Sequence, residues 1–126
     1  MAILKTRALY NFFSGFELPV YEENTVPTGK IAPELPYITY ATATSGFDDN
    51  VQISASLWYK GYAWDDADRK AAEISAALAH GGKMIPYTDG ALWIRRGTPF
   101  AQHMADTDGK KRRIYLNLTA EFLSAE

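Results

Sequence analysis

Apolar side chains recur with helical spacing in two parts of this chain. The first stripe predicts an amphipathic helix over residues 3–14, and the second predicts a helix over residues 65–79 that Gly81-Gly82 would end. The inward positions of the first helix are Leu9, Phe12, Phe13 and Phe16. Those of the second are Ala67, Ala71, Ile74 and Leu78, with Arg69, Lys70 and Glu73 facing away. Asp65 stands where the N-cap of the second helix belongs.

Other parts of the chain alternate between apolar and polar residues, as strands with one buried face do. Residues 37–44 and 51–59 predict a hairpin, because the stretch between them is rich in turn-forming residues. Four short strands fit the remainder, over residues 83–87, 91–96, 100–104 and 111–123. Asp89-Gly90 and residues 106–109 supply the turns of two more hairpins.

A proline-rich segment, residues 19–36, separates the first helix from the first hairpin. Prolines at this density favour an extended connection, which we interpret as a surface loop in preference to a short strand in its first few residues. The predicted element order is α-β-β-α-β-β-β-β. We therefore predict one α+β domain over residues 1–126, with an antiparallel sheet of about six strands and two helices packed on it.

Composition and charge narrow the classes of function. The chain has 126 residues, 47% hydrophobic and 22% charged, as in ordinary globular domains. Its net charge of -2 argues against a dedicated nucleic-acid binder, and the lack of cysteine excludes disulfides and thiolate chemistry. The start does not resemble a secretory signal, and no stretch is apolar enough to cross a bilayer. We expect a soluble protein that stays in the cytoplasm.

The sequence offers no recognisable catalytic apparatus. His80 and His103 are the only histidines and lie far apart in the sequence, and no serine has the surroundings of a nucleophile elbow. The carboxylates of Asp65, Asp66 and Asp68 are explained by their position at the start of a helix. We therefore expect no enzyme activity, no cofactor and no metal site.

Positive charge is concentrated in one run, residues 110–113. Arg95 and Arg96 lie on a neighbouring predicted strand, so the two groups could form one basic patch. Such a patch could be a solvated strand end or a nucleic-acid contact. The intermediate interpretation is a surface that meets an acidic protein partner. The acidic net charge counts against specific nucleic-acid binding.

The tryptophans indicate that the sheet is covered on both faces. Trp58 follows Leu57, and Trp93 lies between Leu92 and Ile94, so both faces of these strands carry apolar bulk. The helices can cover one face, and the other face needs another cover. This pattern favours a sheet that is buried in an assembly.

Five segments carry a likeness to a known family: LPYITY from residue 35, SLWY from residue 56, AEI from residue 72, GALWIRRGTPFAQ from residue 90 and RRIYLN from residue 112. In their order and spacing they resemble the small tail-completion, or tail-terminator, proteins of long-tailed bacteriophages. The resemblance covers the chain from about residue 35 to its end. The earlier residues match only in general character.

The resemblance implies a structural protein without cofactor. Proteins of this family form a ring, commonly six-fold, that caps the tail tube, stops further addition of tube subunits and offers the surface to which the head joins. It therefore implies three partners: other copies of the chain, the tail-tube protein and a head-completion or connector protein. The implied location is the neck end of the virion tail, reached after assembly in the bacterial cytoplasm.

Six residues are the expected partner contacts: Trp93, Arg95, Arg96, Phe100, Arg112 and Arg113. Two other functions stay open at this point. One is another neck, head-completion or baseplate component, which would assemble with portal or head subunits instead of tube subunits. The other is a small ligand-binding α+β domain, which would need an enclosed pocket with convergent polar groups.

Overall fold

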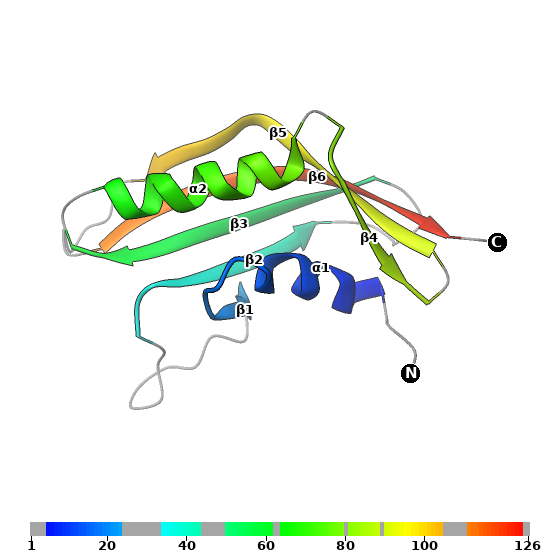
Figure 1. Cartoon of the computed structure of the whole chain (residues 1–126), viewed down its shortest axis with the longest axis horizontal. Helices are drawn as coiled ribbons and strands as arrows, with labels where there is room; N and C mark the ends of the chain where they lie inside the picture. The colour runs from blue at the N-terminus through cyan, green and yellow to red at the C-terminus, as the bar shows by residue number, and fades with distance from the viewer. Residues whose placement is uncertain are drawn as a thin grey trace.

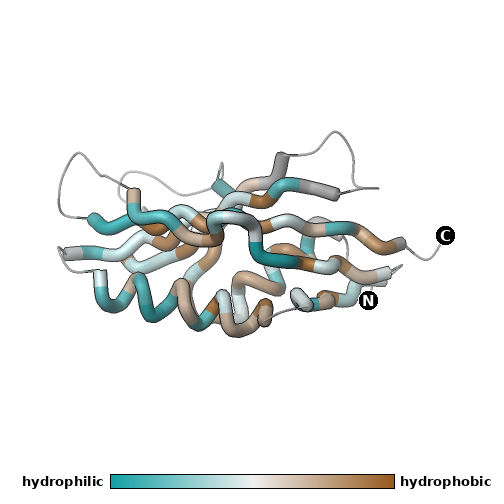
Figure 2. The backbone as a smooth tube through the Cα atoms, turned by 90° about the horizontal axis from the view of Figure 1, so that it is seen from above, coloured by the Kyte–Doolittle hydropathy of each residue, from teal (hydrophilic) through white to brown (hydrophobic). Residues whose placement is uncertain are grey.

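The structure, a computed structural model, describes residues 5–23, 34–43, 50–61, 64–79, 81–88, 90–104 and 111–124. In this part of the chain two helices lie on one side of a six-stranded sheet (Figures 1 and 2). The helices are α1 (Lys5–Ser14) and α2 (Asp65–Leu78). The strands are β1 (Val20–Glu22), β2 (Tyr37–Ala43), β3 (Asn50–Lys60), β4 (Lys83–Tyr87), β5 (Gly90–Met104) and β6 (Lys111–Ser124). The α+β class and the number of strands agree with the prediction.

The strands follow one another across the sheet in the order β1-β2-β3-β6-β5-β4. Four neighbouring pairs are antiparallel, and β1 runs parallel to β2. The hairpins predicted between β2 and β3, β4 and β5, and β5 and β6 are all present as antiparallel pairs. Their turn residues 44–49, 89 and 105–110 lie outside the described part of the chain.

Strand β1 corrects the interpretation of residues 19–36 as a loop. Val20, Tyr21 and Glu22 pair with β2, and the backbone N–H of Ile38 donates to the carbonyl oxygen of Pro19 at 2.9 Å. Val20 is buried beside Ile38 in the core. The short run has no strand signal of its own, because its pairing partner and its burial come from a distant segment. Residues 24–33 of the predicted loop lie outside the described part.

Strand β5 joins two strands that the sequence predicts separately. Arg96 pairs with Leu118 and Ala101 pairs with Leu116, so residues 97–100 lie opposite the single residue Asn117. This bulge explains the apparent break, since Gly97, Thr98 and Pro99 are typical of strand ends. A β-carbon at Gly97 would lie 2.9 Å from the carbonyl oxygen of Asn117, so the close approach requires glycine. The strand therefore bends without ending.

The core lies between the helices and the inner face of the sheet. All the predicted inward residues of both helices are buried, and they pack in one cluster with inner-face residues from all six strands. Lys70 departs from its prediction as an outward residue. Its Nζ atom donates to the carbonyl oxygen of Phe16 at 2.9 Å and to Glu73 Oε1 at 3.2 Å. Lys70 thus joins α2 to the segment that follows α1.

The start of α2 differs by one residue from the prediction. The helix begins at Asp65 and its cap residue is Trp64, which makes no side-chain capping hydrogen bond. The first hydrogen bond of the helix runs from the backbone N–H of Asp68 to the carbonyl oxygen of Trp64 at 2.8 Å. The predicted N-cap Asp65 therefore lies in the first turn, where Asp66 and Asp68 join it.

Two tyrosines make the stability of the fold sensitive to alkaline pH. Burial raises the pKa of Tyr40 and of Tyr59 above the ordinary value of 10.0, and the nearby carboxylates of Glu22 and Asp66 add to the effect. These two tyrosines therefore ionise at lower pH in the unfolded chain than in the folded one. The stability that their neutral forms contribute is fully present below pH 10 and is lost as the pH rises through the raised pKa values. We expect the unfolding midpoint in urea to fall less between pH 9 and pH 11 in Tyr40→Phe/Tyr59→Phe than in the wild type. Equal losses would contradict this assignment.

Candidate interaction surface

The face of the sheet that points away from both helices is here called the outer face. Three large hydrophobic side chains are exposed in the described part of the chain: Met84 (49%), Met104 (36%) and Leu123 (38%). All three belong to the outer face, because they pair with Trp93, Arg113 and Ala91 at positions that alternate with buried ones. The outer face is therefore the side on which the described chain exposes large apolar groups.

A row of four aromatic side chains and one arginine crosses the outer face near the β1 edge. It comprises Tyr21 on β1, Tyr37 on β2, Trp58 on β3, and Arg113 and Tyr115 on β6, and we call it the aromatic row. The ring centroids of Tyr21 and Tyr37 are 5.9 Å apart, and those of Tyr37 and Trp58 are 6.3 Å apart. The Arg113 guanidinium lies 4.7 Å from the Trp58 ring and 5.9 Å from the Tyr115 ring. Four neighbouring strands thus present one continuous amphipathic surface.

Two buried hydroxyl groups anchor two members of the aromatic row, Trp58 and Arg113. Thr39 and Ser56 are only 6% and 3% exposed although they lie on the outer face, because the row covers them. The Trp58 Nε1–H donates to Thr39 Oγ1 at 3.0 Å, and the Arg113 Nε–H donates to Ser56 Oγ at 3.0 Å. Side chains held in this way lose little conformational freedom on binding. Tryptophan, tyrosine and arginine are also the residues most enriched among energetic anchors of protein interfaces.

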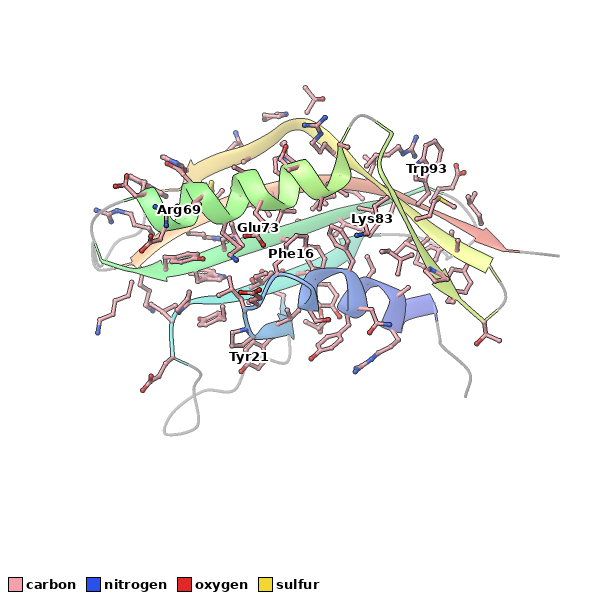
Figure 3. The ribbon with its side chains drawn as sticks, viewed as in Figure 1. Phe16, Tyr21, Arg69, Glu73, Lys83 and Trp93 are labelled. Carbon is pink, nitrogen blue, oxygen red and sulfur yellow. The ribbon has the colours of Figure 1, made fainter. Side chains whose placement is uncertain are left out.

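Trp93 and Arg95 form a second, smaller pair on the outer face. The Arg95 guanidinium lies 4.1 Å from the Trp93 ring, and Trp93 Nε1–H donates to the carbonyl oxygen of Gly81 at 2.7 Å. The pair is well separated from the aromatic row, as the positions of Trp93 and Tyr21 show (Figure 3). The predicted contacts Trp93 and Arg95 therefore do come together.

Arg96 and Phe100 lie at the bulge of β5, beside the end of α2. Arg96 points to the helix side, where its guanidinium donates to Ser75 Oγ at 2.9 Å and to the carbonyl oxygen of Ala79 at 2.8 Å. It therefore satisfies a carbonyl group that the helix end leaves without an intrahelical partner. Phe100 is half-buried against the core. Both residues have a structural role in addition to any contact with a partner.

Arg112 belongs to a third group, at the start of α2. Its guanidinium lies 5.4 Å from the Trp64 ring, which stacks on the imidazole of His103 at 3.6 Å. His103 Nε2 is 2.6 Å from Asp68 Oδ1, so this group joins the far end of β5 to the first turn of α2. Sequence reasoning treated Asp68 and His103 separately, because their separation of 35 residues gives no hint of contact.

The predicted basic patch is not formed. Arg95 lies opposite Thr119, which is six residues along β6 from Arg113, a separation of roughly 20 Å in an extended strand. Arg95 and Arg113 are on the outer face, whereas Arg96 and Arg112 contact the helix side. Lys110, the first residue of the run, lies outside the described part. The six predicted contacts therefore occupy four places on the sheet.

Most of the aromatic row was missed at the sequence level. Trp58 had been singled out as a sign of a covered outer face, and Arg113 as an expected contact. Tyr115 could have been found, because it occupies an outward position of a strand whose alternation is clear. Tyr21 could not, since its strand was not predicted. The cross-strand neighbours follow only from the register, in which Trp58 lies opposite both Tyr37 and Arg113.

A hollow of about 530 Å³ opens between the end of α2 and the bulge of β5. Its walls include Ala79, Gly82, Arg95, Arg96 and residues 97–100. Among the described residues, no three histidine, aspartate or glutamate side chains gather closely enough to hold a metal ion. Neither helix of the described chain has the length and apolar character of a membrane span.

The fold is shared with solved structures. No model of a protein family matches this sequence, and no curated protein matches it either. A chain in a structure described as the virion of a native gene transfer agent particle superposes with a TM-score of 0.68 and 20% sequence identity. The match covers 94% of this chain and 93% of that chain. A second solved chain superposes with a TM-score of 0.62 at 15% identity, over 95% of this chain and 96% of the other. The arrangement of two helices on a six-stranded sheet is thus a known fold, present in a chain of a virus-like particle.

Proposed function

We propose that this chain is a structural virion protein that caps a phage tail tube as a ring and excludes further tube subunits by occupying the tube end. In this role it stops tube growth and forms the surface to which the head joins. Its partners are other copies of itself, commonly six in a ring, the tail-tube protein and a head-completion or connector protein. The role requires binding surfaces and no catalytic groups.

The observation that carries this proposal is the outer face of the sheet. Two members of its aromatic row, Trp58 and Arg113, are hydrogen-bonded to buried hydroxyl groups, and its exposed residues include Met84 and Met104. Large apolar groups on a sheet face that no described element covers are typical of a surface that a partner covers. The shared fold with a chain from a gene transfer agent virion supports a partner within a virus-like particle.

The size of the chain fits this role. A stable subunit contact buries roughly 800 Å² on each partner. The accessible surface of this chain is 7610 Å². Two neighbours in a ring would therefore cover about a fifth of the surface, which leaves the outer face available for the tube.

The experiment is an assembly assay with purified tail-tube subunits of the same particle. Tube subunits are allowed to polymerise with and without this chain, and tube lengths are measured by negative-stain electron microscopy. We expect shorter tubes that end in added density when the chain is present. The variant Met84→Glu/Tyr115→Glu places two charges on the outer face and should fail to cap tubes. Tubes grown with this variant should be as long as tubes grown without the chain.

The matched control changes the opposite side of the molecule. Ala72 and Ala76 are exposed on α2, so Ala72→Glu/Ala76→Glu adds the same charge away from the outer face. This control should cap tubes as well as the wild type does. If tubes grown with the wild-type chain are as long as tubes grown without it, the capping function is contradicted. If the outer-face variant caps tubes as well as the control does, the role of the outer face is contradicted.

A further inference from the structure

The two edges of the sheet carry charges of opposite sign. Around β1, residues 14–23 and 34–43 contain no lysine or arginine, and their charged residues are Glu17, Glu22, Glu23 and Glu34. We call this region the acidic edge. At the other side of the sheet, residues 90–104 contain Arg95 and Arg96 and no aspartate or glutamate. The acidic edge contains the first strand of the sheet order, β1. The other region is β5, which only β4 follows in that order (Figure 1).

Strand β4 leaves much of β5 without a second strand neighbour. It pairs with residues 90–94 alone, so within the described chain residues 95–104 pair only with β6. We call this stretch of β5 the basic edge. An edge strand presents backbone N–H and C=O groups that another chain can pair with. The basic edge therefore offers hydrogen-bonding groups as well as positive charge.

The hollow at the bulge of β5 lies on the basic edge. Its volume of about 530 Å³ has room for side chains of a partner, since one water molecule in the liquid occupies about 30 Å³. Arg95 and Arg96 both line it, together with the exposed Thr98. A carboxylate that enters the hollow would meet guanidinium groups, which bind carboxylates with charge-assisted hydrogen bonds.

We propose that copies of this chain join head to tail, with the acidic edge of one copy seated on the basic edge of the next. This proposal rests on the ring proposed above and names the two surfaces through which neighbouring copies in that ring touch. Contact between two like edges would place glutamate beside glutamate or arginine beside arginine, which is unfavourable. Because each copy carries one edge of each sign, the favourable contact repeats from copy to copy and can close into a ring.

A pair of charge-reversed variants tests the contact. The basic-edge variant is Arg95→Glu/Thr98→Glu, and the acidic-edge variant is Glu23→Lys/Glu34→Lys. Arg96 is kept because its guanidinium binds the end of α2. Each variant alone should need a concentration at least about tenfold higher than the wild type to assemble, measured by light scattering with or without tube subunits. An equimolar mixture should assemble as the wild type does, because each altered edge then meets its complement on the other variant.

The control and the folding check make the outcome specific. Arg69→Glu/Ala72→Glu gives the same change in charge as the basic-edge variant on the exposed side of α2, and it should assemble normally. Far-ultraviolet circular dichroism verifies that each variant is folded. A wild type that forms no oligomer, alone or on tubes, would overturn the ring itself. A wild-type ring that both variants still form, or a folded mixture that fails to assemble, would overturn only the edge contact.

A cross-link provides a test that does not depend on loss of assembly. Thr98→Lys places an amine at the hollow and keeps the positive charge of the edge. A carbodiimide then joins that amine to a carboxylate in direct contact, and mass spectrometry identifies the linked peptides. In a mixture of ¹⁴N-labelled and ¹⁵N-labelled protein, we expect links between copies from position 98 to Glu22, Glu23 or Glu34. Links only to other carboxylates, or only within one copy, would overturn the proposal.

Discussion

Gly82→Ala should unfold the chain far more readily than Gly81→Ala, although the two glycines are neighbours. Gly82 has φ +79°, a conformation that costs an L-residue about 1–2 kcal/mol. A β-carbon there would also lie 2.5 Å from the carbonyl oxygen of Ile94 and 2.8 Å from Trp93 Nε1. Forcing extra atoms into packed surroundings costs a further 1–3 kcal/mol, so we expect a total loss of about 3 kcal/mol.

Gly81 supplies the matched control for this experiment. A β-carbon at Gly81 would meet no atom within 4 Å, and its φ is not in the left-handed region. Gly81→Ala should therefore change the free energy of unfolding by at most about 0.5 kcal/mol. Thermal and urea unfolding measure both variants, with a fall of about 10 °C in Tm expected for Gly82→Ala. Similar unfolding midpoints for the two variants would show that glycine is not needed at position 82, just before β4.

Phe13→Ala should cost about 3–5 kcal/mol, because it removes a large side chain from the interior. Phe13 is 0% exposed, and its ring stacks on Tyr40 with centroids 5.2 Å apart and meets Phe12 edge to face at 5.1 Å. The loss would be a large fraction of the 5–15 kcal/mol by which native proteins of this kind are stable. It would also release α1 from the core that it shares with the sheet.

The control for this prediction is Met84→Ala, since Met84 is 49% exposed on the outer face. Its expected change in the free energy of unfolding of the isolated chain is within about 0.5 kcal/mol. Urea unfolding followed by fluorescence compares the two variants. A loss below about 1 kcal/mol for Phe13→Ala would mean that α1 contributes little to stability.

The sequence predicted the elements whose periodicity is strong. The inward stripe of α2, from Ala67 to Leu78, is buried as predicted, because a helix with one apolar side must turn that side to the core. Strand β6 was equally clear, since its apolar residues alternate without a break. Local patterns of this kind need no knowledge of the neighbouring segment.

The missed features depend on partners that lie far away in the sequence. Val20–Glu22 becomes a strand only because β2 pairs with it, and the bulge of β5 exists only because β6 continues past it. The basic patch was predicted from adjacent strands without their register, which places Arg95 six residues from Arg113 along β6. For the same reason the aromatic row, which is built across four strands, could be foreseen only in part.

The position of β6 in the sheet has a consequence for how the chain folds. β6 lies between β3 and β5, and its pairing with β3 joins Asn50 to Glu121 and Lys60 to Lys111. The centre of the sheet therefore forms by closing loops of many tens of residues, which is entropically costly and slows folding. Until β6 is in place, β3 has an open edge that can pair with other chains. Synthesis of β6 thus completes the centre of the sheet and removes the open edge of β3 as a site for pairing with other chains.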